Sequence, residues 1–143
     1  MSDKAPIHHN VFSGMQYADA LAAIDFLERA FGFTRHAVYP GDGGRAVAHA
    51  ELRAGENGGI VMLGSTRTDS RAYRSPKDAG GVTHGIYIVV KDIDAHHARA
   101  KAAGAEVIHP LEDTDYGSRN YTVRDPEGFL WSFGTYDPEN PDV

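Results

Sequence analysis

The sequence contains no cysteine among its 143 residues. This absence excludes disulfides, thiol nucleophiles, iron–sulfur clusters and cysteine-bound zinc. Positive charge is also scarce, since 14 Lys and Arg stand against 20 Asp and Glu and give a formal net charge of -6. A net negative charge opposes binding to phosphate backbones and to anionic lipid surfaces. We therefore expect neither nucleic acid nor a membrane as a partner.

Long apolar runs are missing as well. The longest one, residues 86–90, is far shorter than the ~20 residues that a helix needs to cross a bilayer. The first ten residues are polar and lack the apolar segment of a signal peptide. Hydrophobic residues make up 41% of the chain and charged residues 24%, which is typical of a folded globular protein. These features predict one cytoplasmic domain over residues 1–143.

An internal repeat links the two halves of the chain. Asp92 lies 73 residues after Asp19, and each of the two follows a strand-like run and precedes a helical pattern. The first pattern, over residues 20–31, carries apolar side chains at helical spacing, and Gly32 ends it. The second is an alanine-rich segment that ends before Gly104. We predict two helices, each with an Asp at its start and a Gly at its end.

Strand-like runs precede and follow each helix. They cover residues 11–17, 33–39, 45–52 and 60–63 in the first half, and 85–90, 105–109, 118–123 and 129–133 in the second. Each half has the order βαβββ, in modules at residues 6–64 and 84–136. Since one helix covers only one face of a sheet, the modules have to pair. The predicted fold class is α+β, with two paired βαβββ modules forming a curved mixed sheet around a shared trough.

Two segments lie outside these modules. Residues 65–83 join them, carry several basic side chains and show little periodicity. The segment is longer than most loops, and it is either a solvated linker or a lid that attracts anions. Residues 137–143 are interpreted as a tail.

Three segments carry a resemblance to a known family: residues 17–33, residues 90–105 and the DPEG turn at residues 125–128. Together they resemble the vicinal oxygen chelate superfamily, which includes glyoxalase I, extradiol dioxygenases and bleomycin-resistance proteins. The resemblance covers nearly the whole chain, and the DPEG turn with the WSFG strand after it is similar to the PhnB-like branch. It implies paired βαβββ modules, a homodimer, and one divalent metal ion held in the trough by four strand residues.

The four metal-binding positions implied by the resemblance carry unsuitable side chains. Phe12 lies seven residues before Asp19, and Gly85 lies seven residues before Asp92. The other two positions are Met62 and Ser132. A phenyl ring, a hydrogen atom and a thioether are not ordinary ligands of divalent ions, and a lone hydroxyl is too weakly basic to anchor one. His84 is one residue out of phase with Gly85 and adds only one imidazole. We expect no metal and no other cofactor.

Strand alternation extends these four positions into a lining for the trough, because side chains two residues apart share a face. The predicted ligand-binding residues on these strands are Phe12, Gly14, Gln16, Ile60, Met62, Gly85, Tyr87, Leu130 and Ser132. This mainly apolar lining suits a flat, partly aromatic molecule, unless the trough is filled by its own side chains. Trp131 and Phe133 have the opposite phase and are predicted to pack against the helices.

Two further residues are candidates for chemistry. His49 and Glu51 stand two apart on one strand and therefore point the same way. If that face turns inward, His49 is a candidate catalytic base, and otherwise the pair belongs to an exposed charged face. Arg119 follows a YGS run, and it is predicted either to bind an anionic group of the ligand or to pair with nearby acids.

The sequence thus predicts a metal-free, small-molecule binding protein of the bleomycin-resistance type, which sequesters a partly aromatic organic compound. The alternative is a glyoxalase-like lyase or isomerase, or a dioxygenase, that uses an unconventional metal site or His49 as a general base. We expect a homodimer whose partner is a small organic ligand. The sequence has no phosphate-binding glycine loop, HExxH motif or GxSxG nucleophile elbow.

Overall fold

The helices and strands follow the order that the repeat predicts. The first half forms β1 (Ser13–Tyr17), α1 (Ala20–Phe31), β2 (Thr34–Pro40), β3 (Val47–Arg53) and β4 (Ile60–Ser65). After the short helix α2 (Pro76–Ala79), the second half forms β5 (Ile86–Val89), α3 (Ile93–Ala102), β6 (Glu106–Asp113), β7 (Arg119–Arg124) and β8 (Leu130–Gly134). The computed structural model describes residues 9–56, 58–67 and 73–141.

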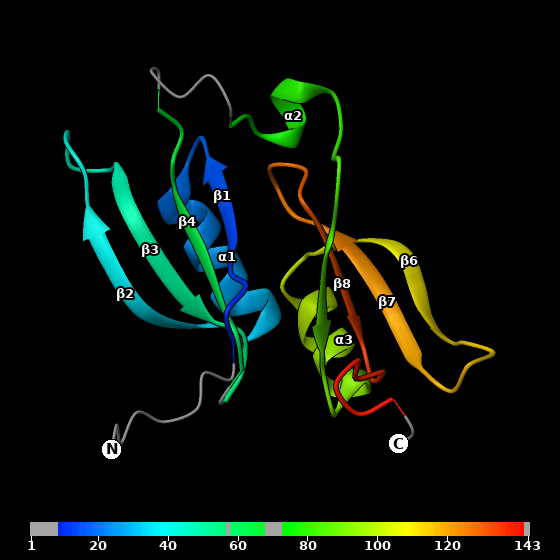
Figure 1. Cartoon of the computed structure of the whole chain (residues 1–143). Helices are drawn as coiled ribbons and strands as arrows, with labels where there is room; N and C mark the ends of the chain where they lie inside the picture. The colour runs from blue at the N-terminus through cyan, green and yellow to red at the C-terminus, as the bar shows by residue number, and fades with distance from the viewer. Residues whose placement is uncertain (1–8, 57, 68–72, 142–143) are drawn as a thin grey trace, which may run out of the picture.

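The strands form two four-stranded sheets of the same topology, side by side (Figure 1). The orders are β1-β4-β3-β2 and β5-β8-β7-β6. In each sheet the module's first and last strands pair in parallel, and the other pairs are antiparallel. The α+β class and the two βαβββ modules predicted from the sequence are therefore confirmed.

Both long helices begin as the repeat predicts. Asp19 and Asp92 are their N-caps, and each carboxylate accepts a hydrogen bond of 3.1 Å from a backbone N–H three residues later. Gly32 ends α1 in the left-handed conformation, with φ 73°, and Gly104 follows α3 with φ 84°. Asp19 and Asp92, which lie 73 positions apart, thus have the same local role, because capping acts within a single helical turn.

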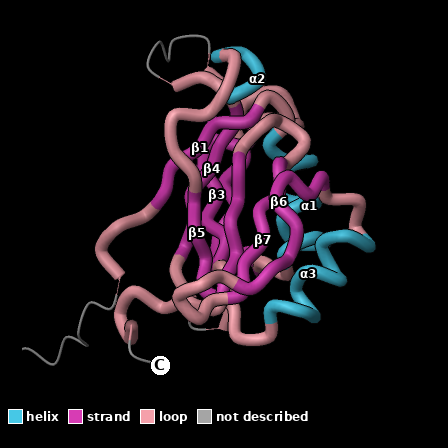
Figure 2. Tube along the Cα trace, turned by 90° about the vertical axis from the view of Figure 1, so that its right-hand side faces the viewer, coloured by secondary structure: helices cyan, strands magenta, loops and turns pink. Residues whose placement is uncertain are grey.

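The core lies between the sheets and the helices, and it crosses the module boundary. Helices α1 and α3 contact each other on one side of the strands, and no helix covers the opposite side in the part of the chain that is described (Figure 2). The ring of Phe31, at the end of α1, lies 4.7 Å from that of Phe133 and 5.6 Å from that of Trp131. Trp131 and Phe133 are fully buried, as their strand phase predicts.

The DPEG turn holds the second module against the first. The buried carboxylate of Asp125 accepts hydrogen bonds from the Tyr17 hydroxyl at 2.6 Å and from the Trp131 ring nitrogen at 3.0 Å. The neighbouring Glu127 carboxylate accepts one from the backbone N–H of Asp19 at 3.0 Å. Because β1 and the start of α1 belong to the first module, this turn fixes how the two modules are joined.

Part of the segment between the modules forms the short helix α2. Ser75 caps the short helix α2 by accepting a hydrogen bond from the backbone N–H of Asp78 at 3.3 Å. Pro76 packs so closely on the DPEG turn that a Cβ on Gly128 would lie 3.1 Å from its own Cβ. Residues 65–83, predicted to be a solvated linker or a lid that attracts anions, thus include a short helix that contacts the second module, and residues 68–72 lie outside the described chain. None of the described helices has the length and apolarity to span a membrane.

Candidate functional site

A large cavity lies between the edge strands β1 and β5 and has a volume of about 790 Å³. Five of the predicted ligand-binding residues line it, namely Phe12, Gly14, Ile60, Gly85 and Tyr87. We call it the main cavity. The side chains of Phe12 and Tyr87 are 42% and 38% exposed. The sequence-predicted trough therefore presents aromatic surface to solvent on both modules.

Part of the lining of the main cavity was not predicted from the sequence. The C-terminal segment Asp137–Glu139, interpreted above as a tail, lines the cavity together with His9, Val11 and His84. The Tyr87 hydroxyl donates a hydrogen bond of 2.7 Å to the carbonyl of Tyr136, which holds this segment against β5. No local pattern reveals the contact, because it joins residues 49 positions apart.

A smaller cavity of about 190 Å³ lies at the other end of β1. We call it the small hollow. Gln16, Met62 and His49 line it, and Gly14 lines both this hollow and the main cavity. The two spaces are therefore neighbours along β1, with Gly14 in the lining of each.

His49 lies on the face of the first sheet that forms the small hollow. Its Nε2 is 2.9 Å from Oε2 of Glu51, and Glu51 stands opposite Met62 in the register of β3 and β4. Oε1 of Glu51 lies 3.9 Å from Nε2 of His36. The ring of Tyr39 stacks beside His49, with centroids 6.1 Å apart. The pair thus lies on the face of the sheet that carries the small hollow, where the His49 side chain is 42% exposed, and the role of His49 as a base stays a prediction.

The two predicted ligand-binding residues of β8 lie outside both spaces. Leu130 and Ser132 line neither the main cavity nor the small hollow. The Ser132 hydroxyl forms a hydrogen bond of 2.8 Å with that of Thr122 on the adjacent strand. Ser132 therefore already has a polar partner within its own sheet.

Arg119 forms ion pairs, which is the second of its two predicted alternatives. Its NH2 and NH1 atoms lie 3.2 Å from Oδ1 of Asp94 and 3.2 Å from Oδ1 of Asp113, respectively. These hydrogen bonds, the one to Asp94 first, raise the pKa of the guanidinium above its ordinary value. Arg119 has the same strand phase as buried Tyr121, and Asp94 belongs to α3, so its side chain lies on the helix side of the sheet. The structure does not bring it to the main cavity or to the small hollow.

The residues at the four implied metal positions do not fit a divalent ion. Phe12 and Gly85 supply no donor atom, Met62 supplies only a thioether, and the hydroxyl of Ser132 is bonded to Thr122. Across residues 9–56, 58–67 and 73–141, no three His, Asp or Glu side chains gather closely enough to hold a metal ion. We derive no chemistry through a metal.

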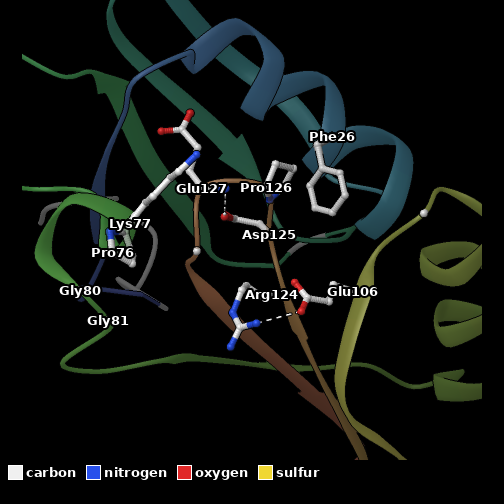
Figure 3. A pocket seen from close by; sticks show the side chains of 12 residues that line it. Phe26, Pro76, Lys77, Gly80, Gly81, Glu106, Arg124, Asp125, Pro126 and Glu127 are labelled. Atoms are coloured by element: carbon white, nitrogen blue, oxygen red, sulfur yellow. Dashed lines mark hydrogen bonds and ion pairs between the residues drawn. The ribbon is translucent and has the colours of Figure 1, made fainter.

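A third cavity, of about 440 Å³, lies beside the DPEG turn (Figure 3). Four of its charged groups have partners: Arg124 is 2.8 Å from Glu106, and the carboxylates of Asp125 and Glu127 accept the hydrogen bonds that join the modules. Lys77 also lines this cavity. Burial raises the pKa of Asp125 above its ordinary value. This cavity therefore borders the junction between the modules, and most of its charged groups serve that junction or pair with each other.

Comparison with protein families gives a match over most of the chain. Residues 7–133 match the Glyoxalase/Bleomycin resistance protein/Dioxygenase superfamily. The chain is 40% identical over 118 residues to the uncharacterized protein Rv0887c of Mycobacterium tuberculosis (strain ATCC 25618 / H37Rv), an alignment that covers 81% of this chain and 68% of that protein.

Solved structures share the fold. The structure of TioX from Micromonospora sp. ML1 superposes with a TM-score of 0.69 at 36% identity and covers 88% of this chain and 94% of its own. That of TnmS3, an antibiotic binding protein from Streptomyces sp. CB03234, superposes with a TM-score of 0.63 at 22% identity and covers 91% of this chain and 97% of its own. The second likeness establishes the fold alone.

Proposed function

The chain belongs to the glyoxalase/bleomycin resistance protein/dioxygenase superfamily, and on that premise we propose that it sequesters a partly aromatic organic compound in the main cavity, without a metal ion. The observation that carries the proposal is the lining of that cavity. Phe12 and Tyr87 offer aromatic faces, and Gly14 and Gly85 leave room between them. The volume of about 790 Å³ lies within the range of small-molecule sites, about 300–1,000 Å³.

Binding without a metal follows from the donor set. The strand positions that the family uses for metal ligands hold Phe12, Met62, Gly85 and Ser132. A protein that only sequesters its ligand needs shape and apolar contact, and in the main cavity Gly85 and Phe12 supply them. TnmS3, which shares the fold, is an antibiotic binding protein, and this supports sequestration as the activity.

The proposal includes a homodimer. Val11 and Val89, which line the main cavity, are 88% and 40% exposed. Apolar side chains in such a position are costly to leave in water, and a second copy of the chain would cover them. Sedimentation analysis of the wild type would reveal a dimer, and a monomer at all concentrations would contradict this part.

The proposed function is tested by thermal shift with 4-phenylphenol, 4-methoxybiphenyl and 2-naphthol. Ligands that bind the folded state raise the melting temperature in a saturable way. We expect such a rise for the wild type, and its loss in Gly85→Leu, which fills the cavity. Gly85→Ala is the matched control, because a Cβ at this position meets only a carbonyl oxygen, that of Leu130, at 3.8 Å.

Two outcomes of that experiment would contradict the proposal. One is that none of the three compounds stabilises the wild type, and the other is that Gly85→Leu binds as the wild type does. Chromatography of the recovered compounds adds a second readout. Because the proposed activity is sequestration, each compound is expected to leave the protein chemically unchanged.

Proton transfer by His49 is the second candidate function, and the contact of 2.9 Å between its Nε2 and the Glu51 carboxylate favours it. A carboxylate at this distance orients an imidazole as a general base. Arg119 takes no part in this candidate, because its guanidinium lies on the helix side of its sheet. The test is deuterium exchange at the methyl group of 4-acetylbiphenyl in D₂O, which should slow at least tenfold in His49→Ala.

A further inference from the structure

One buried polar atom of the described chain has no hydrogen-bond partner, the side-chain oxygen of Gln16. A buried acceptor without a donor is costly, and native proteins rarely keep one without a reason. Gln16 belongs to β1, two residues after Gly14 and on the same face of the strand. The unpartnered atom therefore belongs to a residue that lines the small hollow beside the main cavity.

His49 adds a second acceptor to this hollow. The Glu51 carboxylate, 2.9 Å from Nε2 of His49, accepts the proton of that nitrogen when the ring is neutral. The other ring nitrogen, Nδ1, then carries a lone pair and accepts hydrogen bonds. The negative charge of Glu51 on the same face opposes an anionic ligand here. Arg67 also lines the hollow and has a bonding partner of its own.

We propose that the small hollow is a polar subsite, which binds a hydrogen-bond donor of the ligand, a hydroxyl or an amide N–H, through Gln16 and His49. This inference rests on the proposed function, because the aromatic part of the same ligand occupies the main cavity. The ligand class is therefore an aromatic compound that carries a neutral donor group at one end.

The geometry of β1 sets the length of this ligand. Phe12, Gly14 and Gln16 follow one another on one face, and a strand rises about 3.3 Å per residue. The donor thus lies roughly 7 Å from the level of Gly14 and roughly 13 Å from that of Phe12. A compound of two or three linked or fused rings spans this distance.

Gly14 lies where the two spaces come next to each other. It lines both of them, and a Cβ built on it meets no atom within 4 Å. Its backbone is outside the left-handed region, so a larger residue causes no strain there. Gly14→Leu should divide the continuous site, while Gly14→Ala keeps it open.

The experiment compares two probes by calorimetry, 4-phenylphenol and 4-methoxybiphenyl. They have the same rings, but the methyl ether has no donor. A site built to bond a donor rejects an analogue that lacks it. We expect the wild type to bind the phenol at least tenfold more tightly, and Gln16→Leu to reduce this preference to less than threefold. Gln16→Glu, which keeps an acceptor, should retain the preference.

The outcomes separate the two proposals. Equal binding of both probes by the wild type, or an unchanged preference in Gln16→Leu, would overturn the polar subsite and leave the proposed function standing. Failure of both probes to bind would overturn the proposed function, and the subsite with it. Gly14→Leu should remove the preference for the phenol, and a preference that survives in this variant would also count against the subsite.

Discussion

The hydroxyl of Tyr17 donates a hydrogen bond of 2.6 Å to the carboxylate of Asp125, 108 residues later in the chain. Both groups are buried, and burial raises the pKa of each above its ordinary value. Asp125, the first residue of the DPEG turn, therefore links the two modules. It satisfies the Tyr17 hydroxyl and the Trp131 ring nitrogen at once.

Asp125→Ala should lower the free energy of unfolding by about 3 kcal/mol, because it leaves the Tyr17 and Trp131 donors buried without an acceptor. Urea denaturation measures the change. Asp115→Ala, at an exposed position, is the control and should change the stability by less than about 0.5 kcal/mol. Similar stabilities for the two variants would show that the junction contributes little.

Arg99→Ala should lower the free energy of unfolding by about 1 kcal/mol. From α3, the guanidinium donates hydrogen bonds to the carbonyls of Arg29 and Glu28 at 2.9 and 3.0 Å, and so caps the end of α1 in the other module. The residue is exposed, which limits the effect. Lys101→Ala on the same helix is the control, and a loss as large as that of Arg99→Ala would contradict the capping role.

Stability should fall as the pH drops from 6.5 to 4. Burial against the aromatic core lowers the pKa of His96 from 6.5 to about 4. The unfolded chain therefore binds the proton first, and the stabilising effect is complete above pH 6.5 and lost as the pH falls towards 4. The full pKa shift of His96 corresponds to a loss of ~3 kcal/mol in the free energy of unfolding, and the partial exposure of the ring reduces this loss to about 2 kcal/mol.

Urea titrations at pH 7.0 and 4.5 measure this effect. His96→Gln has no titratable ring, so its stability should change less between the two pH values than that of the wild type. If the variant loses as much stability as the wild type does, His96 is not the group responsible.

Tyr87→Phe should weaken binding of 4-phenylphenol about fivefold, as expected for one lost hydrogen bond of about 1 kcal/mol. The hydroxyl holds the C-terminal segment at the main cavity through the carbonyl of Tyr136. Tyr116→Phe is a matched control, since it also loses a hydrogen bond, to Asn120, but lies outside that cavity. Calorimetry should give unchanged affinity for the control, and equal losses in both variants would count against the holding role.

Removal of metal ions should change neither folding nor binding. The four implied positions lack a workable donor set, so treatment with EDTA should leave the melting temperature and the affinity for 4-phenylphenol as they were. Elemental analysis of untagged protein measures bound metal directly. One zinc, nickel or manganese ion per chain, lost together with ligand binding, would contradict the metal-free proposal.

The local parts of the fold were predictable from short stretches of sequence. Asp19 and Asp92 cap their helices through contacts three residues away, and Gly32 ends α1 within one turn. The alternation along β8 assigned Trp131 and Phe133 to the helix side, where both are fully buried. The same alternation brought Phe12, Gly14 and Tyr87 to one cavity. The ligand-binding roles of these residues remain predictions.

Other parts of the site depended on contacts that no local pattern reveals. The sequence left Arg119 between a ligand and nearby acids, and one of its two partners, Asp94 on α3, lies 25 residues away in the chain. It treated residues 137–143 as a tail, although Asp137–Glu139 lines the main cavity. It did not single out the side-chain oxygen of Gln16. This oxygen is buried without a hydrogen-bond donor only in the folded chain, where residues of β1, β3 and β4 line the small hollow.

The sequence by itself determined the two modules, their order of elements and the strand faces, because caps and alternation act over a few neighbouring residues. Only the tertiary structure decided that Asp125 meets Tyr17, that the C-terminal segment lines the cavity, and that Gln16 and His49 share a hollow. These residues are far apart in the chain. Gln16 and His49 are separated by 33 positions, and Tyr17 and Asp125 by 108. Packing of the whole chain selects among the many partners that each residue has within reach.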